Sequence, residues 1–235
     1  MKNDSLYVVV LAGGKGSRMG AVCSTCPKPL LPVGDKPLLG HILAKLQQAR
    51  RLPDTVYVQP HDVLVTRFVR EEIAGRDIEF LPCDAEMGPF FWIRNVYRRT
   101  DGPILAVYGD FFAPAFDIGS FLKEAAQLRK PLVAAIGHSR PTTQAAVFDV
   151  DGTDVRDWTR KPRNVPGDLL NVGCYLIEHN EHMDAAFSAC RSFLEDDVFP
   201  KLIPERRMGA CVVPGEFINV NTPENLDAAR TLGEE

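Results

Sequence analysis

The chain has 235 residues, which is enough for one large domain or two small ones with a buried core. Its composition, with 45% hydrophobic and 25% charged residues, is that of an ordinary globular protein. The formal net charge of −4 gives no general attraction for nucleic acid or for an anionic membrane, so an anionic ligand must be met by local basic groups.

The first apolar stretch, residues 6–12, is too short to span a bilayer. Glycines and basic residues follow it at once instead of a small-residue cleavage site, so we expect a cytoplasmic protein with no membrane partner. The six cysteines show no framework spacing and are expected to be free thiols. Cys23 and Cys26 have no second pair with which to form a structural zinc site.

Over the first two thirds of the chain, short aliphatic runs alternate with amphipathic stretches. The runs cover residues 7–11, 55–59, 78–81, 104–108 and 132–136, and the stretches cover 38–51, 63–74, 92–99 and 118–129. This alternation predicts a mostly parallel sheet with helices on both faces. The near-continuous apolar character of the first and last runs is typical of strands that are buried on both sides.

The pattern changes after residue 140. Two runs, 145–149 and 155–159, flank Asp151-Gly152, a strong hairpin signal, and 169–177 follows as a further strand. We therefore expect antiparallel strands beside the main sheet. Two helices, two short strands and a last helix are predicted after them, at about 182–191, 194–203, 210–213, 217–220 and 223–232.

The segment after the first run, LAGGKGSRMG, is rich in glycine and carries three basic or hydroxyl side chains. Glycine lets the backbone approach a ligand closely, and successive N–H groups in such a turn can bind an anion. The segment is not a P-loop, because no Lys-Ser or Lys-Thr pair follows Gly16 or Gly20. It also breaks the dinucleotide fingerprint at the third glycine, and the prolines from residue 27 onward exclude a long helix.

Together with the downstream CPKPLLPVGDKPLL, this loop strongly resembles the N-terminal signature of the nucleotidyltransferase superfamily that includes the sugar-1-phosphate nucleotidyltransferases. The resemblance implies that the loop holds a nucleoside triphosphate and that the lysine of P-K-P neutralises phosphate charge during transfer. The implied nucleotide-binding residues are Leu11, Ala12, Gly13, Gly14, Gly16 and Ser17, and the implied catalytic cations are Arg18 and Lys28. Attack on an α-phosphate builds charge on its oxygens, which fixed cations stabilise.

Two further motifs concern a metal ion. Tyr108-Gly109-Asp110 ends a predicted strand, where open α/β sheets place ligands, and resembles the family's G-D motif. The resemblance implies that Gly109 lies beside the nucleotide and that Asp110 is catalytic and binds Mg²⁺. Near the end of the chain, Asn219 stands where the family usually has a second metal-binding aspartate, as in the related molybdenum-cofactor guanylyltransferases. We expect Asn219 to be a weaker, neutral metal ligand.

The acceptor side also departs from the family pattern. Arg160-Lys161-Pro162 occupies the place of the E-K-P motif, which implies that Lys161 binds the acceptor's phosphate. Arg160 replaces a sugar-binding glutamate, so it either indicates a second anionic group or an altered sugar on the acceptor, or points to solvent. Asn171 and Gly173 resemble the N-x-G-x-Y strand of the acceptor pocket, although Asn171 has the alternative of bonding neighbouring backbone.

Two acidic and aromatic segments complete the comparison. Glu195-Asp196-Asp197, at a predicted helix start, favours an interaction with the helix dipole over metal binding. Residues 86–92 differ from the family's L-G-T-A-G-A. Gly88 is expected near the nucleobase, while Phe91 either packs in the core or reshapes the base pocket.

We therefore predict an α/β fold: a Rossmann-like three-layer sandwich with a mixed, mostly parallel central sheet, as in the GT-A-like nucleotidyltransferase fold. One domain, 1–235, would hold a nucleotide in residues 1–140 and an acceptor in 141–235. The chain ends soon after the last predicted helix, so no left-handed β-helix domain is expected. Members of this family are often dimeric or tetrameric, and the sequence leaves open whether this chain forms a homo-oligomer.

The predicted reaction joins an NTP to a phosphorylated small molecule, a sugar 1-phosphate, with Mg²⁺, and releases pyrophosphate. Neither the base nor the acceptor follows from the sequence. Alternatives are a molybdenum-cofactor-type guanylyltransferase, a phosphocholine-type cytidylyltransferase, or a non-catalytic nucleotide-binding regulatory module.

Overall fold

The computed structural model describes residues 5–14, 16–49, 55–82, 88–140, 143–188 and 193–234. The strands are β1 (Tyr7–Ala12), β2 (Pro32–Val33), β3 (Lys36–Pro37), β4 (Thr55–Pro60), β5 (Asp77–Phe80), β6 (Ile104–Tyr108), β7 (Phe111–Phe112), β8 (Leu132–Ser139), β9 (Thr143–Asp151), β10 (Asp154–Arg163), β11 (Leu169–Ile177) and β12 (Met208–Asn219). The α-helices are α1 (Leu38–Gln48), α2 (Val63–Glu72), α3 (Pro89–Tyr97), α4 (Ile118–Leu128), α5 (Glu181–Ser188), α6 (Leu194–Asp197), α7 (Phe199–Leu202) and α8 (Pro223–Glu234). Two 3₁₀ helices, η1 (Ser17–Cys23) and η2 (Lys28–Leu30), follow β1.

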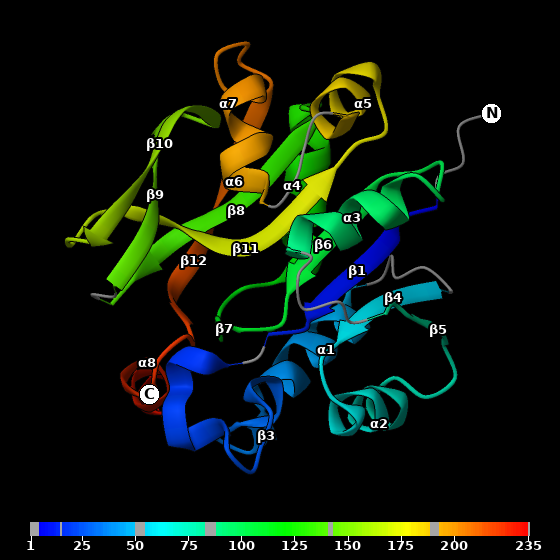
Figure 1. The fold of residues 1–235 in the computed structure, drawn as a ribbon. Coiled ribbons are helices and arrows are strands. Elements are labelled where there is room, and N and C mark those ends of the chain that lie inside the picture. Colours follow the sequence, from blue (N-terminus) through cyan, green and yellow to red (C-terminus); the bar gives the residue numbers. More distant parts are fainter. Residues whose placement is uncertain are drawn as a thin grey trace.

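A large central sheet organises the described part of the chain, with its strands in the order β5-β4-β1-β6-β11-β8-β12-β10-β9 (Figure 1). Its first four strands are parallel, as the strand–helix alternation predicts. Beyond β6 the pairing is mixed: β8 and β12 are parallel, whereas β11 is antiparallel to both β6 and β8. The β9–β10 hairpin and β7 add further antiparallel pairs.

The prediction of a mixed sheet is therefore confirmed, and the prediction that it is mostly parallel is not. The reason is the insertion of β11 between β6 and β8 in the opposite direction, together with the hairpin that turns at Asp151-Gly152. A tight two-residue turn can only join antiparallel strands.

Helices cover both faces of the sheet (Figure 1). Alternate residues of β1 enter separate cores, because successive side chains of a strand point to opposite faces. Val8 and Val10 pack in the core that α1, α2 and α4 cover. Val9 and Leu11 pack in the core that α3, α5, α6 and α7 cover. This arrangement is the predicted three-layer sandwich, and it explains why β1 is apolar along its whole length.

Two predicted elements differ in detail. The helix expected at 194–203 is divided into α6 and α7, because Pro200 lacks the N–H that would continue the first helix. The two short strands expected at 210–213 and 217–220 form one long strand, β12, with an irregularity between Val212 and Glu216.

The carboxyl ends of β1, β4 and β6 meet at one edge of the sheet, where open α/β folds bind ligands. The Gly109 amide donates to the Leu11 carbonyl over 2.8 Å, which joins the ends of β6 and β1. The end of β12 comes to the same edge, because the Val220 amide donates to the Asp110 carbonyl over 2.7 Å. Segments from both ends of the chain thus surround this edge.

No helix in the described residues is long and apolar enough to cross a membrane.

Gly173 shows why β11 needs a glycine at this edge. Its φ is +93°, and β11 changes register between Asn171 and Tyr175. A Cβ atom at this position would lie 3.1 Å from the Tyr108 Cβ. A glycine in a strand often marks a place where another group comes close to the backbone, and at Gly173 that group is the Tyr108 side chain.

We expect Gly173→Ala to lower the melting temperature more than Gly152→Ala. Both glycines have positive φ, a backbone conformation that costs a non-glycine residue about 1–2 kcal/mol. Only at Gly173 does the added methyl group meet another side chain, whereas nothing lies within 4 Å of the corresponding position at Gly152. Thermal unfolding followed by circular dichroism measures the difference, and equal shifts in the two variants would contradict this reading of β11.

Candidate functional site

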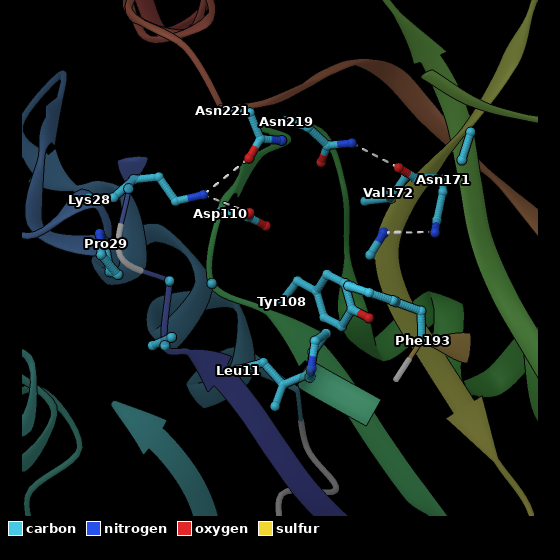
Figure 2. A pocket seen from close by; sticks show the side chains of 18 of the residues that line it. Leu11, Lys28, Pro29, Tyr108, Asp110, Asn171, Val172, Phe193, Asn219 and Asn221 are labelled. Atoms are coloured by element: carbon cyan, nitrogen blue, oxygen red, sulfur yellow. Dashed lines mark hydrogen bonds and ion pairs between the residues drawn. The ribbon is translucent and has the colours of Figure 1, made fainter. Parts of the chain in front are cut away.

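A pocket of about 640 Å³ lies at this edge of the sheet (Figure 2). It is lined by most of the predicted site residues: Leu11, Ala12, Gly13, Gly14, Gly16, Ser17, Arg18, Lys28, Gly109, Asp110, Arg160, Asn171, Gly173 and Asn219. Gly88 and Lys161 do not line it. The structure therefore brings together residues from the first loop, the end of β6, the hairpin, β11 and the end of β12.

Two cations and a carboxylate meet on the glycine-loop side of the pocket. Lys28 Nζ lies 2.8 Å from Asp110 Oδ2 and donates to Asn221 Oδ1 over 3.2 Å (Figure 2). Arg18 also donates to Asn221 Oδ1, over 3.1 Å. The Lys28 side chain is only 9% exposed, because it stands in η2 between two prolines and reaches inward. One neutral amide oxygen thus holds both cations beside a carboxylate.

Asn221 escaped the sequence analysis as a site residue. Its position follows from the turn between β12 and α8, where its amide donates to Asn225 Oδ1 over 3.4 Å. The available signal was its place two residues after Asn219 and directly before Thr222-Pro223. Two asparagines in that spacing reach the same pocket because they leave the sheet at its binding edge.

Gln59 is a second pocket residue that sequence reasoning missed, and it packs beside the glycine loop. This side chain is buried at the end of β4 and lines the pocket. A Cβ atom on Gly13 would lie 1.9 Å from Gln59 Oε1, so glycine is needed there to admit the amide. Gly16 has the left-handed φ of +62° that the loop's tight turn requires. A polar residue at the end of an otherwise apolar strand was the signal for Gln59.

Asp110 and Asn219 are the residues that could hold a divalent cation. Asn219 Nδ2 donates to the Asn171 carbonyl over 2.9 Å, which turns Asn219 Oδ1 toward the pocket (Figure 2). The described residues contain no group of three or more His, Cys, Asp or Glu side chains that could hold a metal ion. One carboxylate with one amide oxygen fits Mg²⁺, which takes its remaining ligands from phosphates and water.

On the opposite wall, Asn171 bonds to the protein itself. Its Oδ1 accepts from the Gly173 amide over 3.0 Å, and its Nδ2 donates to Tyr175 Oη and, over 3.0 Å, to Glu195 Oε1. Of the two roles open for Asn171 in the sequence, the structure displays bonding to neighbouring protein groups. Glu195 lies at the start of α6, where a helix start was predicted, and its side chain is buried against Asn171 and Tyr175.

The two basic residues of the Arg160-Lys161 pair separate. Arg160 lines the pocket, with Nη2 3.5 Å from Asp196 Oδ1 and its guanidinium 5.6 Å from the centre of the Trp158 ring. Lys161 Nζ lies 2.8 Å from Asp168 Oδ1, and its hydrogen bond lowers the pKa of Asp168. The structure thus places Arg160 in the pocket and Lys161 outside it.

The unusual aromatic segment is only partly described, because 83–87 lie outside the described residues. Gly88 precedes α3, next to Pro89, which does line the pocket. Phe91 packs edge to face on Trp92, with ring centres 4.8 Å apart, and against the core below α3. This position agrees with the alternative that Phe91 packs in the core.

The stability of Glu195→Gln relative to the wild type should increase as the pH rises from 4.5 to the raised pKa of Glu195, and should then stay constant. Burial raises the pKa of Glu195 above its ordinary value of 4.5. The folded protein then keeps a proton that the unfolded chain has lost, so stability falls as the pH rises from 4.5 to the raised pKa and is constant beyond it. Glutamine cannot ionise. Melting temperatures of both proteins between pH 4.5 and 8 measure the difference, and a gap that stays constant would contradict the prediction.

The chain is similar in sequence to curated nucleotidyltransferases. A mannose-1-phosphate guanylyltransferase of Mycobacterium tuberculosis is 26% identical over 96% of this chain and 64% of its own length. The bifunctional protein GlmU of Methanocaldococcus jannaschii is 27% identical over 93% of this chain and 52% of its own length. The chain thus spans about half to two thirds of the length of these curated relatives.

Two solved structures share the fold. A candidate glucose-1-phosphate thymidylyltransferase from Bacillus anthracis, in complex with sucrose, has a TM-score of 0.83 at 18% identity and covers 98% of this chain and 96% of its own. HddC from Yersinia pseudotuberculosis has a TM-score of 0.73 at 19% identity and covers 96% of this chain and 98% of its own.

Residues 8–161 match the family described as the MobA-like NTP transferase domain. This segment contains the glycine loop, Lys28, Asp110 and the Arg160-Lys161 pair, and it covers more than half of the chain. The predicted nucleotidyltransferase resemblance is confirmed, and the chain belongs to the family of MobA-like NTP transferase domains.

Proposed function

We propose that this protein transfers a nucleotidyl group from an NTP to a sugar 1-phosphate and releases pyrophosphate. The observation that carries the proposal is a cluster at the end of the glycine loop: Arg18 and Lys28 both donate to Asn221, and Lys28 also donates to Asp110. This group offers two cations and a metal-binding carboxylate to a triphosphate. The family match and the names of the relatives support the same reaction class.

In the proposed reaction, a phosphate oxygen of the acceptor attacks the α-phosphorus of the NTP in line. A new bond forms between that oxygen and the α-phosphorus, while the bond from the α-phosphorus to the oxygen bridging the β-phosphate breaks and pyrophosphate leaves. An ionised phosphate monoester is already a nucleophile, so the protein need not remove a proton. Its task is to position two anions and to offset their charge.

Each charged residue has a role in this scheme. Arg18 and Lys28 stabilise negative charge on the triphosphate as it redistributes toward the leaving pyrophosphate. Asp110 and the Asn219 oxygen would hold Mg²⁺, which would supply further positive charge to the triphosphate. Asn221 fixes Arg18 and Lys28 without cancelling their charge, because an amide oxygen is neutral. Asp110 Oδ2 holds Lys28 directly.

We further propose that the base is guanine and the acceptor a hexose 1-phosphate. Several curated relatives are mannose-1-phosphate guanylyltransferases, and HddC was also solved with GMP-PN. Thymidylyl transfer is the alternative, from the Bacillus anthracis structure. The second candidate is a molybdenum-cofactor-type guanylyltransferase, which Asn219 favours.

A reaction panel tests these proposals. The protein is incubated with Mg²⁺, each NTP and dTTP in turn, and a set of acceptors: hexose 1-phosphates, phosphocholine and molybdopterin. Release of pyrophosphate is measured. We expect the fastest release with GTP and a hexose 1-phosphate. Nucleotide binding without pyrophosphate release from any pair would instead identify a regulatory nucleotide-binding module.

Lys28→Ala and Asp110→Ala should each lower kcat at least about 100-fold, since removing one preorganised electrostatic group from an active site typically has an effect of this size. The same pyrophosphate assay measures it. Lys123→Ala is the matched control, because Lys123 is exposed on α4 and does not line the pocket. Near-wild-type rates in either pocket variant would remove these residues from the mechanism.

Chelation should stop the reaction reversibly. With EDTA in excess over divalent cations, pyrophosphate release is expected to fall to background, and added Mg²⁺ should restore it. The physical reason is that the described residues contain no group of three or more His, Cys, Asp or Glu side chains that could hold a metal ion, so much of the metal coordination must come from the nucleotide. Full activity in EDTA would show that Arg18 and Lys28 suffice as counter-charges.

A further inference from the structure

We propose that Gln59 reads the base of the bound nucleotide, through hydrogen bonds between its side-chain amide and the edge of the base. This inference rests on the proposed function and names a residue that sets its base specificity. Gln59 belongs to none of the sequence motifs that indicate the family. It lies near the carboxyl end of β4, at the binding edge of the sheet.

The side-chain amide of Gln59 is buried without a hydrogen-bond partner. The residue is only 4% exposed, yet its Oε1 and Nε2 atoms make no hydrogen bond to any residue in the described ranges. Burying an amide in this way is unfavourable, and the large majority of buried polar groups in proteins are paired. Because Gln59 lines the pocket, a bound molecule can supply the missing donor and acceptor.

The register of β1 fixes where this amide lies. Gln59 pairs with Leu11 across β4 and β1, and Leu11 pairs with Tyr108 across β1 and β6. Paired residues of neighbouring strands point to the same face of a sheet, so the three side chains form one row across the binding edge. Figure 2 shows Leu11 and Tyr108 of this row in the pocket. Gln59 is at the β4 end of the row.

This end of the pocket lies away from the charged cluster. Asp110 follows β6, and β1 separates β6 from β4, which places the two strands about 10 Å apart. The wall that carries Asn171 lies in the other direction, on β11 beyond β6. An NTP whose phosphates lie at Lys28 and Asp110, and whose α-phosphorus faces an acceptor on the β11 side, therefore extends its nucleoside toward Gln59.

The surroundings of Gln59 suit an uncharged, flat group. The amide lies against the glycine loop, since a Cβ atom on Gly13 would be 1.9 Å from Gln59 Oε1. On the face of the sheet that α3 covers, Pro89 and Trp92 add apolar side chains to the pocket lining. A neutral amide with apolar neighbours recognises a base by hydrogen bonds and contact area, whereas phosphates are met by cations.

An amide at a fixed position discriminates between bases. It presents a donor and an acceptor side by side, as in the paired contacts that amide side chains make with base edges. With guanine, Nε2 can donate to O6 while Oε1 accepts from N1–H. The edges of purines and pyrimidines lie at different distances from the ribose, so one amide cannot reach every base equally. Contacts with ribose or phosphates, by contrast, are the same for all NTPs.

Direct binding tests the inference. Isothermal titration calorimetry with Mg²⁺ measures the affinities of GTP, ATP, CTP and UTP for the wild type and for Gln59→Leu, which keeps the approximate volume and removes the amide. We expect the affinity for GTP to fall about 10- to 30-fold, as the loss of two neutral hydrogen bonds predicts. The affinity for at least one other NTP should change less than about threefold.

A matched control and a stability measurement separate this role from a structural one. Gln47→Leu is the control, because Gln47 donates to the Glu72 carbonyl and does not line the pocket. It should leave all four affinities unchanged. Gln59→Leu should raise the melting temperature of the free protein, because it removes a buried amide that has no partner. An amide that served only the fold would lower the melting temperature on removal.

Three outcomes would overturn the inference: an equal loss of affinity for all four NTPs in Gln59→Leu, no loss for any of them, or a wild type that binds no NTP. An equal loss would place the contact on the ribose or the phosphates. A largest loss with an NTP other than GTP supports the inference and reassigns the base. The reaction is judged separately: base-dependent binding without pyrophosphate release from any substrate pair would refute the proposed transfer and leave the role of Gln59 intact.

Discussion

The ion pair between Lys28 and Asp110 is the interaction on which the rest of the pocket depends. It joins η2 to the turn after β6. The segment between β12 and α8 contacts both, because Lys28 donates to Asn221 and the Val220 amide donates to the Asp110 carbonyl. Along the chain, Lys28 lies 82 positions from Asp110 and 193 positions from Asn221. They meet because each segment leaves the buried sheet at the same edge. A buried charge is stable only when it is paired and hydrogen-bonded, and the buried Lys28 satisfies that condition.

The charged side chains on the two walls of the pocket are held in different ways. On the glycine-loop side the cations are fixed by Asn221 and Asp110, which suits a group that must be in place before the reaction. On the other side Glu195 is buried within a hydrogen-bonded cluster, and Arg160 remains exposed. Asn221, from the last part of the chain, reaches the glycine-loop side of the pocket, and Asn219 donates to the Asn171 carbonyl on the other side.

Much of the fold was predictable because its signals are local. The apolar runs located β1, β6 and β11 within about one residue, since strands buried on both faces must be apolar throughout. The Asp151-Gly152 turn and the capped start of α8 were also local signals. The direction of β11 was not predictable in this way. It depends on pairing with β6 and β8, and an apolar run fits a parallel or an antiparallel neighbour equally well.

The sequence by itself determined the glycine loop, the order of the charged motifs and the family that they indicate, because these features depend on residue type and spacing. Only the tertiary structure decided that Gln59 fills the space beside Gly13, that Asn221 holds Arg18 and Lys28, and that Arg160 faces the pocket while Lys161 faces Asp168. The physical reason is the two-residue period of a strand: a shift of one position moves every side chain to the other face, and the register that sets this shift is fixed by distant partners.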